Sequence, residues 1–533
     1  MNFSATKISY RNTNSFSRLV LDYLDSAEQL KDFYTYSTDI EGLKKAVEDR
    51  KNFPVNRAVL VAELKEQYKS TEISDKLKDN LEALLSENTF TICTAHQPNI
   101  FTGHLYFVYK ILHAIKLSEE LATAISDKRF VPVYYMGSED ADLDELGEIY
   151  INGSNYKWNT AQKGAVGRMF IDKEFIKIID AIAGQLAVEK FGEEIIQMIR
   201  FCYKENNTIE NATFQFVHSL FNKYGLVILM PDNPIFKNEF KTVIKKELAE
   251  QFSEKVVMAT AAKFPKEYKV QAAGRKINLF YLKDNFRERI EKDGSRFKVA
   301  NTSFYFSAGE IEAEVDLNPE RFSPNVILRP VFQETILPNV AFIGGGGEIA
   351  YWLELKSVFK GANVFFPPLI LRNSFTVIEK KATDKIEILG FKEDDIFKTE
   401  NQLLEEIVLR DTKIKLDIKE EKEAVKNIYD RVKDITAAVD STLNCHVHAL
   451  KTQVLNKLEI LEKKMLKAQK KKFDAQQRQI KKIKSNVNPL NNLQERVDNI
   501  LVYLAIYGDS FIDLLYKEQT VFSSEFTILS EQS

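Results

Sequence analysis

Hydrophobic and polar positions between Phe90 and Met136 follow the pattern of one α/β unit. Phe90–Ala95 is a short β-rich run, Leu105–Leu121 has apolar residues at helical spacing, and Phe130–Met136 is a second apolar run. Strand, loop, helix and strand at this spacing predict a βαβ unit. Such a unit belongs to a parallel sheet with helices on its faces.

Three later segments are predicted to add strands to this sheet, namely Gly225–Met230, Asn325–Leu328 and Asn363–Leu371. The stretches at about 151–210 and 250–322 do not fit a regular alternation, and we interpret them as insertions that cap the core. The pattern therefore predicts an α/β fold with a Rossmann-like parallel-sheet core at residues 1–380.

The chain changes character after Ser374, where glycine and proline become rare and Lys, Glu, Leu and Ile dominate. Apolar residues recur there at steps of three and four: Leu443, Val447, Leu450, Val454, Leu458, Leu461 and Met465. Lys451–Lys484 contains twelve basic and three acidic residues, whereas Phe391–Asp430 contains eight basic and twelve acidic residues. These opposite charges predict an antiparallel α-helical coiled coil at 381–510. We expect 511–533 to return to the core or to a neighbouring chain.

Composition narrows the class of protein. With 533 residues and 44% hydrophobic composition, the chain should form more than one folded unit. Its apolar runs are too short to cross a bilayer and its N-terminus has no secretory h-region, so we expect a cytoplasmic protein. Three scattered cysteines predict no disulfide framework, and Cys445 with His448 falls short of a zinc site, so we expect no metal held by the protein.

The run Thr94-Ala-His-Gln-Pro-Asn-Ile-Phe-Thr-Gly-His-Leu-Tyr106 joins the first predicted strand to its helix. Ligands bind at the carboxyl ends of parallel strands, where helix N-termini offer free N–H groups to phosphate. Gly103 allows close backbone approach, and His104 is placed to contact a phosphate oxygen. Its Gly-His-Leu resembles class I aminoacyl-tRNA synthetases and related nucleotidyltransferases, although Phe101 replaces their first histidine. An ordinary capped turn would give the same pattern.

A second candidate segment follows the strand at Phe130–Met136 and carries five carboxylates: Glu139, Asp140, Asp142, Asp144 and Glu145. A solvated acidic loop would explain this run. The functional alternative is that Asp140 or Asp142 binds an amine or a nucleotide-bound Mg²⁺ through hard oxygen ligands.

A third candidate is the glycine turn Gly344–Gly347, which leads into a predicted helix and offers unblocked N–H groups to an anion. No Lys-Ser or Lys-Thr follows, so this is not a Walker motif, and a plain turn is equally compatible. Arg329 and Arg372 are placed near predicted strands, where a guanidinium suits a carboxylate or phosphate. We expect the loops at 96–104, 139–142 and 344–348 to line one pocket.

Together, these segments resemble the bacillithiol biosynthesis cysteine-adding family, BshC, in order and spacing. The family pattern reads T-G-Q-Q-x-G-x-F-T-G-P-L-Y, E-D-H-D, R-P-x-x-Q-D-x-x-L-P, G-G-x-x-E-I-A-Y-W and P-R-x-S-F. This chain departs from it at Ala95 and His96, at His104 in place of proline, at Ala141 in place of the loop histidine, and at Glu334 in place of aspartate. An acid–base role for the loop histidine therefore does not hold here.

The resemblance implies a nucleotidyltransferase-type core and a ligase that adds cysteine to glucosaminyl-malate, the last step of bacillithiol biosynthesis. A free carboxylate is a poor electrophile, so ATP with Mg²⁺ is the implied activator, through either adenylyl or phosphoryl transfer. The implied catalytic residues are His104, Asp140 and Asp142. The implied substrate- or nucleotide-binding residues are His96, Gln97, Thr102, Gly103, Glu139, Arg329, Gly345, Gly346, Glu348 and Arg372.

Partners follow from the same resemblance and from the helices. We expect cysteine and glucosaminyl-malate as substrates, a homodimer through the coiled coil, and neither membrane nor nucleic acid as a partner. The alternative function is nucleic-acid binding through the basic helix, because clustered lysines neutralise phosphates. Phe473 is the sole aromatic residue in Lys467–Lys484, which argues against a stacking platform for bases.

Overall fold

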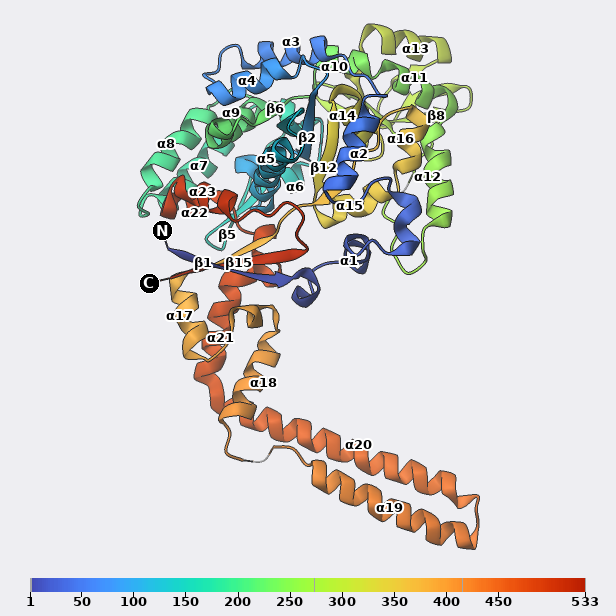
Figure 1. The fold of residues 1–533 in the computed structure, drawn as a ribbon, viewed down its shortest axis with the longest axis vertical. Coiled ribbons are helices and arrows are strands. Elements are labelled where there is room, and N and C mark those ends of the chain that lie inside the picture. Colours follow the sequence, from blue (N-terminus) through green and yellow to red (C-terminus); the bar gives the residue numbers. More distant parts are fainter. Residues whose placement is uncertain (1, 273, 415, 533) are drawn as a thin grey trace. The chain divides into compact units, whose positions relative to one another are not determined.

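The computed structural model describes residues 2–272, 274–414 and 416–532 and contains two compact units (Figure 1). The first unit comprises Lys7–Thr376 and Asn492–Thr527, and the second is built mainly from Val377–Asn491. Residues 492–510, which the sequence pattern groups with the helical domain, lie in the first unit. The chain passes between the units within β1 (Phe3–Ser9), β14 (Phe375–Ile378) and β15 (Glu525–Glu531), which form a three-stranded sheet of order β1-β15-β14.

A five-stranded parallel sheet forms the centre of the first unit (Figure 1). Its order is β13-β12-β2-β3-β6, with bounds β2 (Thr89–His96), β3 (Arg129–Met136), β6 (Val227–Leu229), β12 (Asn339–Gly344) and β13 (Leu369–Leu371). Strands β2 and β3 pair in register from Thr89 opposite Arg129 to His96 opposite Met136. This arrangement confirms the predicted α/β class and the βαβ unit.

Helix α5 (Tyr106–Ala124) connects β2 to β3 and packs on the sheet. Ala114, Leu117 and Leu121 of this helix join Ile92 and Val340 of the strands in one buried cluster. Strands covered on both faces bury nearly every side chain, which explains why their sequences read as continuous apolar runs. The sheet is therefore a rigid base for the loops at its carboxyl edge.

Two predicted strands differ from the structure. Asn325–Leu328 is a turn and not a strand, because the Asn325 side-chain oxygen accepts the backbone N–H of Ile327 at 2.9 Å and starts α14 (Arg329–Ile336). Only the last three residues of the predicted Asn363–Leu371 form a strand, since the two prolines before them lack N–H donors. The sequence pattern also missed β12, which lies beside β2.

The predicted insertions have structure of their own. Residues 151–210 contain α7 (Lys173–Leu186) and α8 (Gly192–Cys202). Residues 250–322 contain α12 (Phe252–Lys263) and most of an antiparallel sheet of order β10-β9-β8-β7-β11, with bounds β7 (Leu279–Lys283), β8 (Phe286–Asp293), β9 (Arg296–Val299), β10 (Tyr305–Phe306) and β11 (Phe322–Pro324). Antiparallel pairing explains why these residues do not fit the parallel α/β alternation.

The remaining elements of the first unit surround the central sheet. They are α1 (Arg18–Leu24), α2 (Ile40–Arg50), α3 (Arg57–Tyr68), α4 (Asp75–Ala83), α6 (Leu143–Leu146), β4 (Glu148–Ile151), β5 (Ser154–Lys157), α9 (Ile209–Phe221), α10 (Pro234–Glu239), α11 (Lys241–Glu250), α13 (Ala308–Leu317), α15 (Gly346–Leu353), α16 (Lys356–Ala362), α22 (Ile500–Tyr507) and α23 (Ser510–Lys517). Within the described residues, no helix combines the length and apolar character that a bilayer span needs.

The second unit is helical. It contains α17 (Lys380–Ile388), α18 (Glu400–Asp411), α19 (Lys419–Val439), α20 (Leu443–Lys470) and α21 (Asp474–Val487). Helices α19 and α20 form an antiparallel hairpin, visible in Figure 1. Lys451 of α20 pairs with Asp430 of α19 at 2.6 Å, as the opposite regional charges predict, whereas Lys422 and Glu462 pair at 2.5 Å with the charges reversed.

Candidate active site

A cavity of about 820 Å³ lies at the carboxyl edge of the central sheet. Residues at the ends of β2, β3, β12 and β13 or just after them line it, together with residues of β7, β8 and the segment after β11. The structure brings ten of the thirteen predicted site residues into this cavity: His96, Gln97, Glu139, Asp140, Asp142, Arg329, Gly345, Gly346, Glu348 and Arg372. Three loops far apart in sequence therefore meet at one edge, as parallel topology requires.

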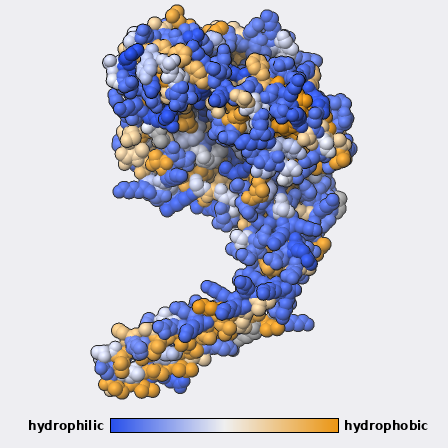
Figure 2. All heavy atoms as spheres, turned by 180° about the vertical axis from the view of Figure 1, so that it is seen from behind, coloured by the Kyte–Doolittle hydropathy of each residue, from blue (hydrophilic) through white to orange (hydrophobic). Residues whose placement is uncertain are grey.

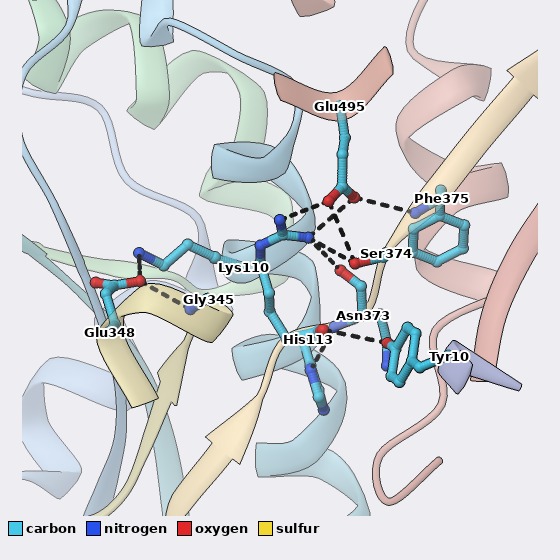
Figure 3. Close-up of polar contacts among 10 residues, drawn as sticks. Tyr10, Lys110, His113, Gly345, Glu348, Asn373, Ser374, Phe375 and Glu495 are labelled. Atoms are coloured by element: carbon cyan, nitrogen blue, oxygen red, sulfur yellow. Dashed lines mark hydrogen bonds and ion pairs between the residues drawn. The ribbon is translucent and has the colours of Figure 1, made fainter. Parts of the chain in front are cut away.

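The glycine turn at the start of α15 is held by Glu348 (Figure 3). One carboxylate oxygen of Glu348 accepts the backbone N–H of Gly345 at 2.8 Å and the ammonium of Lys110 at 2.6 Å. Lys110 also donates to the carbonyl of Ala95 at 2.6 Å. Burial lowers the pKa of Lys110, and the Glu348 carboxylate works against this shift. The sequence analysis missed Lys110, although a lysine on the apolar face of α5 was an available signal.

A second buried ion pair joins Arg372 to Glu495 (Figure 3). The Arg372 Nη2 and Nη1 atoms lie 2.6 and 3.0 Å from the two Glu495 carboxylate oxygens, and both residues are almost fully buried. Arg372 Nη1 also donates to Ser374 Oγ at 3.0 Å. The charge of Arg372 is therefore compensated within the protein. Its Nε is buried, without a hydrogen-bond partner among the described residues, and lies close to Gly345 in the cavity wall.

Arg329 differs from these two cations. Its Nη2 donates to the hydroxyl of Tyr351 at 2.9 Å, and its Nη1 is buried with no hydrogen-bond partner in the described part of the chain. No described carboxylate lies within 4.0 Å of the Arg329 guanidinium. Burial lowers the pKa of Arg329, but Tyr351, Tyr135 and the Glu348 carboxylate outweigh this effect and raise it, so the guanidinium stays charged. Arg329 is thus one candidate group for binding an anion in the cavity.

His96 lies at the end of β2 within the same cationic region. Its ring packs at 5.4 Å, between centroids, against both Tyr106 and Phe107. Burial, and then the positive charge of Lys110, lower the pKa of His96 well below its usual range. The imidazole is therefore neutral at physiological pH, and its buried Nε2 has no hydrogen-bond partner among the residues described.

Carboxylates form the other side of the cavity. Asp140 accepts the side-chain amide of Gln97 at 3.2 Å and its neighbouring backbone N–H at 2.7 Å. Asp142 caps the backbone N–H of Glu145 at 3.2 Å, and Glu139 forms an ion pair with the fully buried Lys237. Burial raises the pKa of Glu139, and Lys237 opposes that shift. Arg287 lies beside Glu139 and Asp140, so this side of the cavity contains charges of both signs with carboxylates in excess. We call this side the acidic region, and the side with Lys110, Arg329 and Arg372 the cationic region.

The other three predicted residues, Thr102, Gly103 and His104, are not among those that line the cavity. His104 Nδ1 lies 3.2 Å from the carbonyl oxygen of Val497, and Asn499 donates its amide to the carbonyl of Gly103 at 2.5 Å. Thr102 and Gly103 have φ angles of +68° and +65°, and a Cβ on Gly103 would approach the Asn99 side chain at 2.8 Å. These residues build the turn before α5, and a catalytic role for His104 stays a prediction.

A parallel-sheet core with a ligand cavity at its carboxyl edge, joined to an antiparallel helical hairpin, defines a Rossmann-like protein with a coiled-coil domain. Residues 3–373 match the bacillithiol biosynthesis BshC N-terminal Rossmann-like domain, and residues 375–531 match the BshC C-terminal coiled-coil domain. The chain belongs to the BshC family of bacillithiol biosynthesis.

Full-length relatives agree with this assignment. Three of them carry the name "Putative cysteine ligase BshC". The relative from Cytophaga hutchinsonii is 40% identical over 97% of both chains, and that from Flavobacterium psychrophilum is 39% identical over 98% of both. The relative from Bacillus cytotoxicus is 25% identical over 94% of this chain and 95% of its own. The similarity therefore covers both units.

Proposed function

We propose that this protein joins cysteine to glucosaminyl-malate through an amide bond, with ATP activating the cysteine carboxylate. The observation that carries the proposal is the divided charge of the cavity: the guanidinium of Arg329 forms no ion pair with a described residue, one of its nitrogens is buried without a hydrogen-bond partner, and several carboxylates line the same space. Ligation needs both regions, because an activated carboxyl develops negative charge on phosphate oxygens while the amine enters as a cation.

The cationic region suits the activation step. Arg329, the backbone N–H groups at the start of α15 and the buried Nε of Arg372 form a set of preorganised donors. Hydrogen-bond donors directed at charge that develops in the transition state act strongly in a site with little water. Removing one such donor typically raises the activation free energy by about 3–4 kcal/mol. Lys110 contributes by fixing Glu348, and through Glu348 the first N–H of the turn.

The acidic region suits ammonium groups and nucleotide-bound Mg²⁺. Asp140 and Asp142 offer hard oxygen atoms, which Mg²⁺ prefers, and the ion would arrive with the phosphates of the nucleotide. The same charges attract the ammonium of cysteine or of the amino sugar. Neutral His96 adds no repulsion to an entering cation, and its uncharged ring suits a packing role beside Tyr106.

A direct reaction tests this proposal. Purified protein is incubated with cysteine, glucosaminyl-malate and MgATP, and mass spectrometry follows the amide product together with AMP and ADP. We expect an amide product that depends on all three substrates. Absence of this product under every nucleotide condition would refute the proposed ligation, while AMP or ADP identifies adenylyl or phosphoryl transfer.

We also propose that the α19–α20 hairpin forms a homodimer. Ile435 and Val439 at the end of α19 are 67% and 81% exposed, and Leu443 at the start of α20 is 38% exposed. Figure 2 shows apolar side chains gathered along this hairpin. An apolar strip on helices is the usual basis of a symmetric helical interface.

A further inference from the structure

Tyr135 is a buried residue of the cavity wall that the proposed function has not yet used. It is the penultimate residue of β3, its side chain is fully buried, and it lines the cavity. Its hydroxyl oxygen has no hydrogen-bond partner among the described residues, whereas the hydroxyl of the adjacent Tyr134 donates to the carbonyl of His96 at 3.2 Å. Buried hydroxyl groups in folded proteins nearly always have a partner. The unpaired hydroxyl of Tyr135 therefore points to a ligand in the cavity.

The Tyr135 ring is held in place by two residues of one helix. Phe332 packs edge-on against it with 6.4 Å between the ring centroids, and the guanidinium carbon of Arg329 lies 5.9 Å from the centre of the ring. Both residues belong to α14. The hydroxyl and the guanidinium thus come from two rigid elements, β3 and α14, which fix them before a ligand binds.

The charges around the hydroxyl favour an anion as its acceptor. Burial, and then the charge of Glu139, raise the pKa of Tyr135 well above its usual range, and Arg329 opposes this shift. The hydroxyl therefore keeps its proton at physiological pH and can donate a hydrogen bond. Glu139 is paired with Lys237 and does not accept that bond. Because like charges repel, the positive charge of Arg329 disfavours an ammonium group at this position and favours an anion.

We propose that Tyr135 is a catalytic residue whose hydroxyl donates a hydrogen bond to a phosphoryl oxygen of the nucleotide, beside the Arg329 guanidinium. The inference rests on the proposed function and deepens it, since it adds a neutral donor to the charged one. The hydroxyl keeps its proton throughout and forms no covalent bond. Its contribution is electrostatic: a fixed donor in a buried site stabilises the charge on the phosphoryl oxygens during transfer to the cysteine carboxylate.

Two variants that each remove one buried hydroxyl test this role. Tyr135→Phe keeps the ring and removes the oxygen. Tyr109→Phe is the matched control, because the Tyr109 hydroxyl is also buried without a partner in the described part of the chain, while Tyr109 is not among the residues that line the cavity. Isothermal titration calorimetry with inorganic pyrophosphate measures the affinity for phosphoryl oxygens without requiring any reaction.

The two variants should separate clearly. For Tyr135→Phe we expect the Kd of pyrophosphate to rise at least about tenfold, and kcat/KM for ATP in amide formation to fall by a similar factor. Its melting temperature should not fall, because no hydrogen bond between described residues is lost. Tyr109→Phe should keep the wild-type Kd and kcat/KM.

Several results would overturn the assignment. They are a wild type that binds no pyrophosphate, a Tyr135→Phe variant with wild-type affinity or wild-type kcat/KM, and an equal loss in both variants. A clear fall in the melting temperature of Tyr135→Phe would also overturn it, because the hydroxyl would then have a partner within the fold. Failure of the proposed function looks different: the wild type would form no amide, while its pyrophosphate binding would still depend on Tyr135.

Discussion

Replacing Arg329 by glutamine should reduce activity without reducing stability. The substitution removes one hydrogen bond to Tyr351, worth about 1 kcal/mol. It breaks no ion pair among the described residues, so no buried carboxylate loses its partner. We therefore expect the melting temperature to change little. A hydrogen bond from a charged donor to developing phosphate charge contributes about 1.5–3 kcal/mol, so kcat/KM should fall roughly 10- to 150-fold.

Arg372 provides the matched comparison, because it is a cavity arginine with an internal partner. Arg372→Gln leaves Glu495 buried without its counter-ion, which costs about 3–5 kcal/mol. The melting temperature of this variant should fall clearly. The double variant Arg372→Met with Glu495→Leu should recover most of that loss, since it removes both charges and keeps the volume.

Steady-state kinetics and thermal unfolding of the purified variants measure both quantities. The reasoning fails if Arg329→Gln melts as early as Arg372→Gln, because the Arg329 charge would then be compensated within the fold. It also fails if Arg329→Gln retains wild-type kcat/KM, because no anion would then depend on this guanidinium.

Three further variants test the site and the hairpin. Asp140→Asn should lower turnover at least about tenfold, which corresponds to a rise of roughly 1.4 kcal/mol in the activation free energy, with little change in melting temperature. Turnover at the wild-type rate would contradict this. His104→Ala tests the predicted catalytic role, which requires turnover per folded molecule to fall at least about tenfold; a lower melting temperature with unchanged turnover would instead assign the ring to the turn, where it contacts the Val497 carbonyl. Ile435→Glu with Val439→Glu should give a monomer by light scattering with the fold intact, and a dimer in this variant would exclude the hairpin surface.

The central βαβ unit was predictable because the residue pattern that specifies it lies within one short stretch of sequence. Strands β2 and β3 are buried on both faces and read as apolar runs, and the glycine at 103 marks the turn between strand and helix. The position of the cavity was also predictable, because the loops that follow parallel strands meet at one edge of the sheet. This rule predicts that Asp140 and Gly345 line one cavity, as the structure shows.

The pairing of charges was not predictable, because it depends on contacts across long sequence separations. Glu495 forms an ion pair with Arg372 across 123 residues of sequence, and Lys110 contacts Glu348 across 238. The sequence pattern therefore does not distinguish Arg372, which has an internal ion-pair partner, from Arg329, which forms no ion pair with a described residue. The error at Asn325–Leu328 has a local cause, since Asn325 bonds the backbone ahead of it and ends the strand pattern. The spacing of apolar residues does not reveal a turn that a side chain forms by hydrogen bonding to the backbone.

Isotope transfer tests the central claim, nucleotide activation of the cysteine carboxyl group in this cavity. Cysteine labelled with ¹⁸O in both carboxyl oxygens is incubated with the protein, glucosaminyl-malate and MgATP. The masses of the products are then measured by mass spectrometry. We predict one ¹⁸O atom in the released AMP or phosphate and one in the amide carbonyl. Amide product formed with unlabelled AMP and unlabelled phosphate would contradict activation of the carboxyl group by the nucleotide.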